Sequence, residues 1–261
     1  LRMICTGGEP WTEKPWKWLF QVIGKSKVPI MNSAGGTEVS GYILHCCLHR
    51  PFKVGSFNAP IPGMSADILN LDGKKVSTNE MGELVMRKSS IGLTKSLWND
   101  DKRYIDNYWS VIKDYWVHGD LASRDADGHW YLHGRSDDTI KVSGKRIGPS
   151  ELESVIVKSG KAKEVAAVGI PDANKGSKII LSIVPAENND QKERFFEDLV
   201  IKDLGKSFKP DKVIFVKDLP KTRNMKIMRR VIKSCLSNQD PGDLSTLLNP
   251  ESVEEIRSHA I

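Results

Sequence analysis

Five short segments of the chain carry the glycine, carboxylate and basic residues that could do chemistry, and they follow one another in one order. They are GGEP at 7–10, GGTE at 35–38, HGD at 118–120, GRSDDTIKVSGKRIGPSELE at 134–153 and LPKTRNMKIMRR at 219–230. Each segment alone is weak evidence, because a strand-end turn, a buried aspartate or a solvated basic helix face has the same residue types. The ordered set is far more specific than its members.

Other phosphate-binding and metal-binding motifs are not supported. The Gly-Lys-Ser sequences at 24–26 and 205–207 lack the upstream glycine of a phosphate-binding loop, and no Gly-x-Gly-x-x-Gly fingerprint occurs. The histidines and cysteines at 45–49 lie close together, but no second ligand pair follows at finger-like spacing. The five ordered segments are therefore the main functional signal.

The ordered set resembles the AMP-forming acyl-CoA synthetases, nearest to the acetyl- and propionyl-CoA synthetase branch, over about residues 3–233. The resemblance implies an AMP-forming acid-thiol ligase, which activates a carboxylic acid with ATP as an acyl-adenylate and passes the acyl group to coenzyme A. ATP, Mg²⁺ and coenzyme A are the implied cofactors. A relative that loads a carrier-protein thiol or drives light emission is a minor alternative, because residues 134–153 and 219–230 match the CoA branch closely.

The resemblance also implies a nucleotide site. Gly8, Glu9 and Pro10 match a turn that lies along the adenine, where a lack of side chains lets the backbone approach a flat base. Thr37 matches a hydroxyl that bonds the α-phosphate. The other implied nucleotide contacts are Asp120 and Arg135 at the ribose and Arg146, which senses nucleotide phosphate and domain position.

Two charged residues match groups that act on the reacting centre. Glu38 matches a carboxylate that holds magnesium, which prefers oxygen ligands. Lys226 matches the lysine that bridges the substrate carboxylate and the α-phosphate, where a point charge offsets growing negative charge, and it is the candidate catalytic residue. Two departures accompany these matches: His118 stands where relatives often have Thr or Ser, and Asn224-Met225 replaces the usual Ser-Gly before the lysine.

The remaining matches concern domain movement, coenzyme A binding and the acyl pocket. Asp137 matches the hinge about which the C-terminal domain rotates between the half-reactions, and Gly144 lies in the loop that lines the pantetheine tunnel of coenzyme A. Gly7 and Gly35 stand where acetate-specific relatives commonly have Val and Trp in the acyl pocket. Because a pocket discriminates each methylene by about 1–3 kcal/mol, these small residues predict an acyl chain longer or more branched than acetate.

The predicted fold class is α/β and α+β, in several domains. Residues 1–52 are expected to be the remnant of an N-terminal α/β subdomain, and short strands punctuated by turns over 53–136 predict a small β-barrel or twisted antiparallel sheet of the adenylating domain. Strands alternating with helices then predict an α+β lid domain over 137–240, mobile by the resemblance, and a tail over 241–261. Its later helices are expected over about 191–204 and 226–235.

Composition sets limits on location and partners. The 261 residues are 39% hydrophobic and 28% charged, no stretch approaches the roughly 18 apolar residues of a membrane helix, and the four cysteines are irregularly spaced. We therefore expect a soluble cytoplasmic protein without a membrane partner. The net charge of +6 permits a polyanion. The basic residues of 221–233 lack interleaved aromatic residues, so we expect no nucleic-acid partner.

One element of the family is not found. The Ser/Thr/Gly-rich loop that grips the β- and γ-phosphates of ATP has no counterpart in these residues and is expected upstream of residue 1. The preferred interpretation is a fragment of a longer enzyme; one piece of a split gene and an inactive remnant rank second and third. The missing N-terminal segment is then a candidate partner. The alternative function is a non-catalytic module that binds AMP, coenzyme A or a partner chain.

Overall fold

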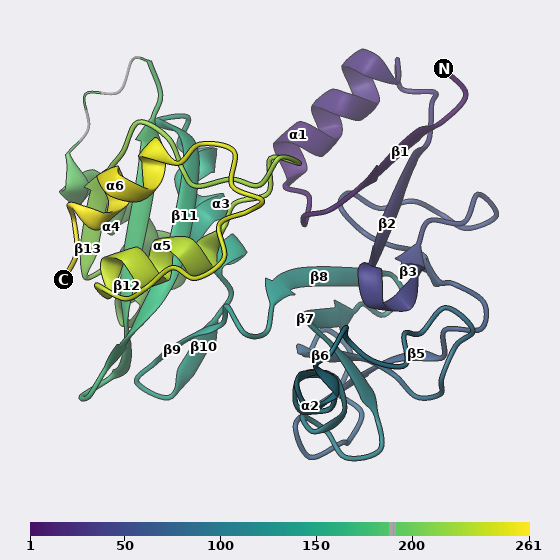
Figure 1. Cartoon of the computed structure of the whole chain (residues 1–261). Helices are drawn as coiled ribbons and strands as arrows, with labels where there is room; N and C mark the ends of the chain where they lie inside the picture. Colours follow the sequence, from purple (N-terminus) through teal and green to yellow (C-terminus); the bar gives the residue numbers. More distant parts are fainter. Residues whose placement is uncertain (188–189, 191) are drawn as a thin grey trace. The chain divides into compact units, whose positions relative to one another are not determined.

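The structure is a computed structural model that describes residues 1–187, 190 and 192–261 (Figure 1). The chain divides into two compact units, Leu1–Asp137 and Asp138–Ile261, and each is described by itself. Both units combine helices with sheets, which confirms the predicted mixed fold class. Within the described residues, no helix is long and apolar enough to cross a membrane.

The first sheet of the N-terminal unit has four strands in the order β1-β2-β3-β4. Its strands are β1 (Ile4–Gly7), β2 (Ile30–Gly36), β3 (Gly41–His45) and β4 (Ala59–Pro60). β1 and β2 run parallel, whereas β3 and β4 are antiparallel to their neighbours. Helix α1 (Glu13–Trp18) belongs to the crossover that a parallel β1–β2 pair requires.

The second sheet of this unit is antiparallel, in the order β5-β6-β7-β8. Its strands are β5 (Ala66–Leu69), β6 (Gly82–Met86), β7 (Trp116–Arg124) and β8 (Trp130–Arg135). The sheet is open, because closing a barrel requires its first and last strands to pair and β5 and β8 are the outer strands of the described sheet. The barrel predicted for 53–136 is therefore not confirmed, whereas the antiparallel sheet is present.

Short helices complete the N-terminal unit. Between β6 and β7 the chain forms α2 (Asp101–Tyr104), which continues as a π-helical turn over Ile105–Trp109. One hydrophobic cluster contains Ile43, Leu84, Tyr104 and Trp116, so residues of both sheets and of α2 share one core. This core supports the end of β2, which leads into Thr37 and Glu38, and strand β7, which carries Asp120.

The C-terminal unit contains a sheet of three strands in the order β11-β12-β13, with helices on both faces. The strands are β11 (Ala162–Asp172), β12 (Gly176–Pro185) and β13 (Lys212–Phe215). The helices are α3 (Pro149–Lys158), α4 (Glu193–Leu204), α5 (Arg229–Leu236) and α6 (Glu251–Arg257). A hairpin of β9 (Ile140–Val142) and β10 (Lys145–Ile147) precedes α3.

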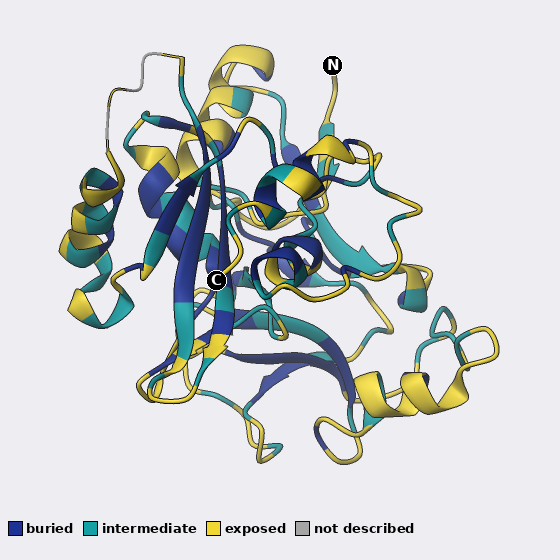
Figure 2. Ribbon diagram, turned by 60° about the vertical axis from the view of Figure 1, so that its left-hand side comes forward, coloured by how far each residue is buried: buried dark blue, intermediate teal, exposed yellow. Residues whose placement is uncertain are grey.

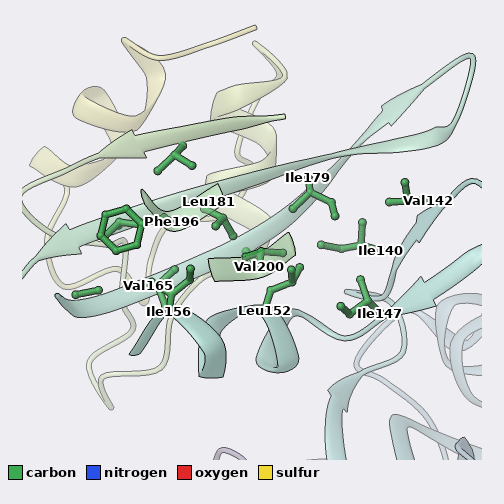
Figure 3. Close-up of a cluster of buried hydrophobic side chains, with 14 residues drawn as sticks. Ile140, Val142, Ile147, Leu152, Ile156, Val165, Ile179, Leu181, Phe196 and Val200 are labelled. Atoms are coloured by element: carbon green, nitrogen blue, oxygen red, sulfur yellow. The ribbon is translucent and has the colours of Figure 1, made fainter. Parts of the chain in front are cut away.

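Alternation along β11 and β12 explains why both faces of this sheet are covered. Successive strand residues point to opposite faces. Val165 and Ala167 pack in one cluster with α3 and α4, whereas Ala166 and Val168 pack in another with α5 and α6. Figure 3 shows the first cluster, in which side chains of the β9–β10 hairpin join those of the helices. The helices turn buried sides to the sheet and leave their other sides exposed (Figure 2).

Two predicted helices and the tail can now be compared with the structure. The predicted start at residue 191 lies outside the described residues, and the helix is described from Glu193. The helix predicted from residue 226 begins instead at Arg229, because Lys226 pairs with Thr222 in a tight hairpin. The tail contains α6, whose Val253 and Ile256 are buried in the second cluster.

We predict that Phe196→Ala lowers the free energy of unfolding by about 3–5 kcal/mol, because Phe196 is fully buried in the first cluster of the C-terminal unit and truncation leaves a cavity. Urea unfolding measures the change. Lys202→Ala on the exposed side of the same helix is the control, with an expected change within about 0.5 kcal/mol. Equal effects of both variants would contradict the described packing of α4.

Candidate active site

Two of the sequence segments lie beside each other at the ends of parallel strands. β1 pairs with β2 so that Gly7 is opposite Ser33, and the carboxyl ends of parallel strands meet at one edge of a sheet. The turn of Gly8, Glu9 and Pro10 follows β1 and is exposed. The Trp11 indole donates a hydrogen bond of 2.9 Å to the Thr6 hydroxyl across this turn. The predicted adenine turn is thus open to a ligand.

Thr37 and Glu38 begin a 3₁₀ helix, Thr37–Val39, directly after β2. Val39 is fully buried and anchors the helix, while Thr37 is exposed and Glu38 half-buried. Among the described residues, no group of three or more His, Cys, Asp or Glu could hold a metal ion by itself. One carboxylate suits magnesium that is shared with phosphate oxygens, so Glu38 fits the predicted ion.

Strand β7 brings His118 and Asp120 together with a buried tryptophan. The rings of Trp116 and His118 lie 5.5 Å apart, and His118 Nε2 lies 3.3 Å from Asp120 Oδ2. Burial lowers the pKa of His118, against the opposing effect of the Asp120 carboxylate. The His118 imidazole therefore lies in a buried position directly beside the Asp120 carboxylate. The departure at His118 adds a polar partner to the predicted ribose residue.

Asp120 and Arg135 are neighbours across β7 and β8, where they form a register pair. Arg135 Nη1 lies 3.6 Å from Asp120 Oδ1 and donates a hydrogen bond of 3.1 Å to the His118 carbonyl. Arg135 Nε donates to the carboxylate of Asp137, 3.1 Å away. Arg135 therefore lies between two carboxylates, those of the predicted ribose residue Asp120 and of the predicted hinge residue Asp137.

Tyr108 is a residue of this cluster that the sequence reasoning missed. Its ring stacks on Trp116 at 5.2 Å with an interplanar angle of 7°. Burial, then the negative charge of Glu38, raises the pKa of Tyr108. The available signal was a pair of tyrosines, Tyr104 and Tyr108, spaced four residues apart before the HGD segment.

The two glycines predicted to enlarge the acyl pocket are not next to open space. A Cβ atom at Gly35 would overlap the Gly41 carbonyl and lie 2.5 Å from Tyr42 Cα, and one at Gly7 would lie 2.7 Å from the Ser33 carbonyl oxygen. Backbone fills the space that a side chain would need. The structure thus gives no volume argument for a longer acyl chain at these positions.

In the C-terminal unit, Gly144 and Arg146 lie on the β9–β10 hairpin. Ser143 and Gly144 both have positive φ, at 48° and 82°, and form its tight turn. Arg146 is exposed on β10, opposite Lys141. Lys145 Nζ donates a hydrogen bond of 3.0 Å to Ser207 Oγ, which ties the hairpin to the segment after α4.

Lys226 lies at the end of a second hairpin, with its side chain exposed. The Thr222 amide donates to the Lys226 carbonyl at 2.9 Å, and the Lys226 amide donates to Thr222 Oγ1 at 3.2 Å. Met225 closes the turn with φ of 63°, in the left-handed region that favours glycine. Met225, which stands in place of the usual glycine, therefore places a side chain at a backbone position that favours glycine.

Ion pairs that are at least partly buried fix both ends of this lysine hairpin. Lys221 before it is buried and pairs with Glu164 at 2.7 Å and Asp218 at 2.5 Å. Arg229 after it binds Glu153 of α3 through two hydrogen bonds of 2.9 and 2.7 Å. Arg229 is thus a structural residue, and the exposed lysine between the two anchors is free to meet a ligand.

Comparisons with known proteins agree with these segments. The model of the AMP-binding enzyme family matches residues 1–98, and that of the AMP-binding enzyme C-terminal domain matches residues 151–226. The chain belongs to this family of AMP-binding enzymes, which confirms the resemblance to adenylate-forming enzymes.

Its relatives include acetyl-coenzyme A synthetases. That of Methanothrix soehngenii is 36% identical over 265 residues, covering 98% of this chain and 39% of the relative. That of Helicobacter pylori strain G27 is 37% identical over 271 residues, covering 99% and 41%. The chain thus spans about two fifths of the length of these relatives.

Two solved structures share the fold. An acetoacetyl-CoA synthetase from Streptomyces lividans superposes with a TM-score of 0.85 at 22% identity, covering 99% of this chain and 40% of that one. An anthranilate CoA ligase in complex with anthranoyl-AMP gives 0.73 at 26% identity, covering 88% and 43%.

We predict that Met225→Gly raises the free energy of unfolding by about 1 kcal/mol, because it relieves left-handed strain at an exposed residue. Thermal or urea unfolding measures the change. The matched variant is Asn238→Gly, since Asn238 has φ of 52° but asparagine tolerates this region, and a smaller gain is expected. A loss of stability in Met225→Gly would show that the turn is not left-handed.

Proposed function

We propose that the protein takes part in the ATP-dependent activation of a carboxylic acid and the transfer of its acyl group to coenzyme A. In the first half-reaction, the carboxylate attacks the α-phosphate of ATP to give acyl-AMP and pyrophosphate. In the second, the thiol of coenzyme A displaces AMP to give the acyl-CoA. The names of the relatives and the membership in the AMP-binding enzyme family support this proposal.

The observation that carries the proposal is the cluster of Glu38, Asp120 and Arg135 in the N-terminal unit. These groups come from three separate segments of the sequence, yet His118 lies between them. A Cβ atom at Gly36 would lie 3.0 Å from His118 Cε1 and 3.3 Å from Glu38 Oε2, and His118 Nε2 lies 3.3 Å from Asp120 Oδ2. Asp120 has the acceptor oxygens that ribose hydroxyls need, and the Arg135 guanidinium provides N–H donors beside it. Residues from distant segments that converge in this way are typical of a ligand site.

Each remaining site residue has a proposed role that its chemistry fits. The Thr37 hydroxyl binds the α-phosphate, and the turn of Gly8 to Pro10 lies along the adenine. Glu38 would hold Mg²⁺, which supplies positive charge to the phosphates. Lys226 offsets negative charge that grows between the carboxylate and the α-phosphate, and its exposure on an anchored hairpin supports this role.

Domain movement is part of the same proposal. Residues 1–52 and 53–136 form the adenylating part and 137–240 the mobile lid, with the hinge at Asp137, the last residue of the N-terminal unit. Gly144 borders the pantetheine of coenzyme A and Arg146 senses the nucleotide phosphate. Their exposed positions on the β9–β10 hairpin support contact with a ligand.

The most specific part of the proposal is the identity of the carboxylic acid. An acyl chain larger than acetate rests on the residue types at Gly7 and Gly35 alone, since backbone fills the space beside both. A panel of C2 to C8 acids decides it. Better turnover of acetate than of butyrate and 2-methylbutyrate would remove this part and leave the ligase activity standing.

We predict that the protein encoded by the longest reading frame that contains this chain catalyses carboxylate-dependent exchange of pyrophosphate into ATP. Lys226→Ala should lower the exchange rate about 100-fold or more, because loss of a charge-stabilising donor in a transition state has effects of this size. Radiolabelled pyrophosphate measures the exchange. Calorimetry with AMP separately measures nucleotide binding by the variant.

Lys233→Ala is the matched control, because Lys233 is an exposed lysine on α5 and has no assigned role. Its exchange rate should stay within twofold of the unaltered protein. Binding of AMP without exchange for any acid in the panel would favour the non-catalytic module. Equal losses in the two variants would remove the catalytic role of Lys226.

A further inference from the structure

We propose that the C-terminal tail positions the hairpin that carries Lys226, and that Asn249 is the positioning residue through which it acts; the functional meaning of this role rests on the proposed function. The hairpin consists of residues 220–228, and the tail segment that contacts it, residues 241–249, belongs to the same unit. We call residues 241–249 the tail strap.

The tail strap adds a third chain segment to the two segments of the hairpin. The first segment of the hairpin is bridged to Ile227 of the second segment on one side and to Leu247 of the tail strap on the other. The Leu248 amide donates a hydrogen bond of 2.8 Å to the Lys221 carbonyl oxygen. Because an isolated two-stranded hairpin is only marginally stable in water, a third paired segment limits its movement.

Asn249 joins the tail strap to the hairpin through its side chain. Its Oδ1 accepts a hydrogen bond of 3.0 Å from the Lys221 amide, and its Nδ2 donates bonds of 2.8 Å to the Leu219 carbonyl oxygen and to Asp218 Oδ2. The Asp218 carboxylate also binds the Lys221 ammonium, at 2.5 Å. Asn249 is buried, so its loss would leave these partners unpaired and away from water.

Both ends of the tail strap are attached to parts of the unit other than the hairpin. At its start, the Arg230 guanidinium of α5 donates hydrogen bonds to the carbonyl oxygens of Pro241 and Asp243, the second at 2.8 Å. Beyond its end, Val253 and Ile256 of α6 are buried in the second hydrophobic cluster. The tail strap therefore links the hairpin to the helices of the unit.

The contacts of the tail strap reach Lys226 through one intermediate residue. Asn224, Met225 and Lys226 form the exposed tip of the hairpin, and Met225 is in the left-handed region that favours glycine. The Lys226 carbonyl accepts its hydrogen bond of 2.9 Å from the Thr222 amide. Thr222 is also the residue bridged to Leu247, so the tail strap supports the segment on which the backbone of Lys226 rests.

Asn249→Ala tests the proposal because it removes three side-chain hydrogen bonds and keeps the backbone of the tail strap. Amide hydrogen exchange without ligand is measured at Thr222 and Met228, whose amides are hydrogen-bonded within the hairpin, in the full reading frame that contains the chain. Asn58→Ala is the matched control, because Asn58 is a buried asparagine of the N-terminal unit whose Oδ1 accepts from the Cys47 amide at 2.6 Å.

We expect Asn249→Ala to speed amide exchange at Thr222 and Met228 about tenfold or more, because buried partners lose their hydrogen bonds. The kcat of pyrophosphate exchange should fall about tenfold, since a small displacement of a positioned group is costly to rate. The affinity for AMP, measured by calorimetry, should stay within twofold. Asn58→Ala should speed exchange at Cys47 and change it less than twofold at the two hairpin amides.

Each outcome supports or overturns a stated part of the proposal. Unchanged amide exchange at the hairpin in Asn249→Ala overturns the support by the tail strap, whatever the activity. Faster amide exchange with full kcat overturns the positioning of Lys226. If the unaltered protein has no pyrophosphate exchange but Asn249→Ala still speeds amide exchange, the proposed function fails and the support of the hairpin stands.

Arg230→Ala is a second variant that leaves the buried contacts of Asn249 in place. Arg230 is exposed, and its removal frees the start of the tail strap. We expect amide exchange about threefold faster at Leu248 and Thr222, in a protein that circular dichroism shows to be folded. If Asn249→Ala does not fold, Arg230→Ala decides, and unchanged exchange at both amides overturns the proposal.

Discussion

The burial of the Trp116 ring is the constraint on which the N-terminal site depends. Trp116 is completely buried, and its ring lies 5.5 Å from that of His118, whose Nε2 lies 3.3 Å from Asp120 Oδ2. Trp116 also provides the surface on which Tyr108 stacks. A single buried ring thereby contacts an imidazole on its own strand and a phenol ring from a helical turn.

In the C-terminal unit, the sheet is buried on both faces. There the long β11–β12 pair provides a base, the β9–β10 hairpin packs on it through buried apolar side chains, and ion pairs hold the Lys226 hairpin. Arg229 reaches α3 and Lys221 reaches β11 and its own turn, so the Lys226 hairpin has fixed ends and an exposed tip. Rigid attachment with an accessible tip suits the role proposed for Lys226.

Much of this arrangement could be predicted from the sequence, and the exceptions have physical causes. The bounds of β5 and the helix start at Pro149 follow from local turn and capping signals. The helix predicted at Lys226 does not begin until Arg229, because periodicity does not reveal a hairpin whose turn residue lacks glycine. Sheet closure depends on pairing between strands distant in sequence, so turn spacing alone did not distinguish the open sheet from a barrel.

The candidate site, too, was only partly predictable from the sequence. The order of the motifs identified the family, which the comparisons confirm, while the individual roles of the site residues stay predictions. Tyr108 was missed because its place beside the site comes from tertiary stacking on Trp116, which the spacing of the two tyrosines alone does not reveal. Gly7 and Gly35 were interpreted through size alone, whereas the direction of a missing side chain depends on the register of β2 with β1 and β3.

The register irregularity of β2 and β3 beside Gly35 has a consequence for protein engineering. A tryptophan placed at Gly35 would run into the neighbouring strand, because its Cβ alone would overlap the Gly41 carbonyl. A bulkier residue here would first require redesign of the β2–β3 connection. The residue type at this position is therefore set by the backbone geometry of its neighbours as well as by any ligand.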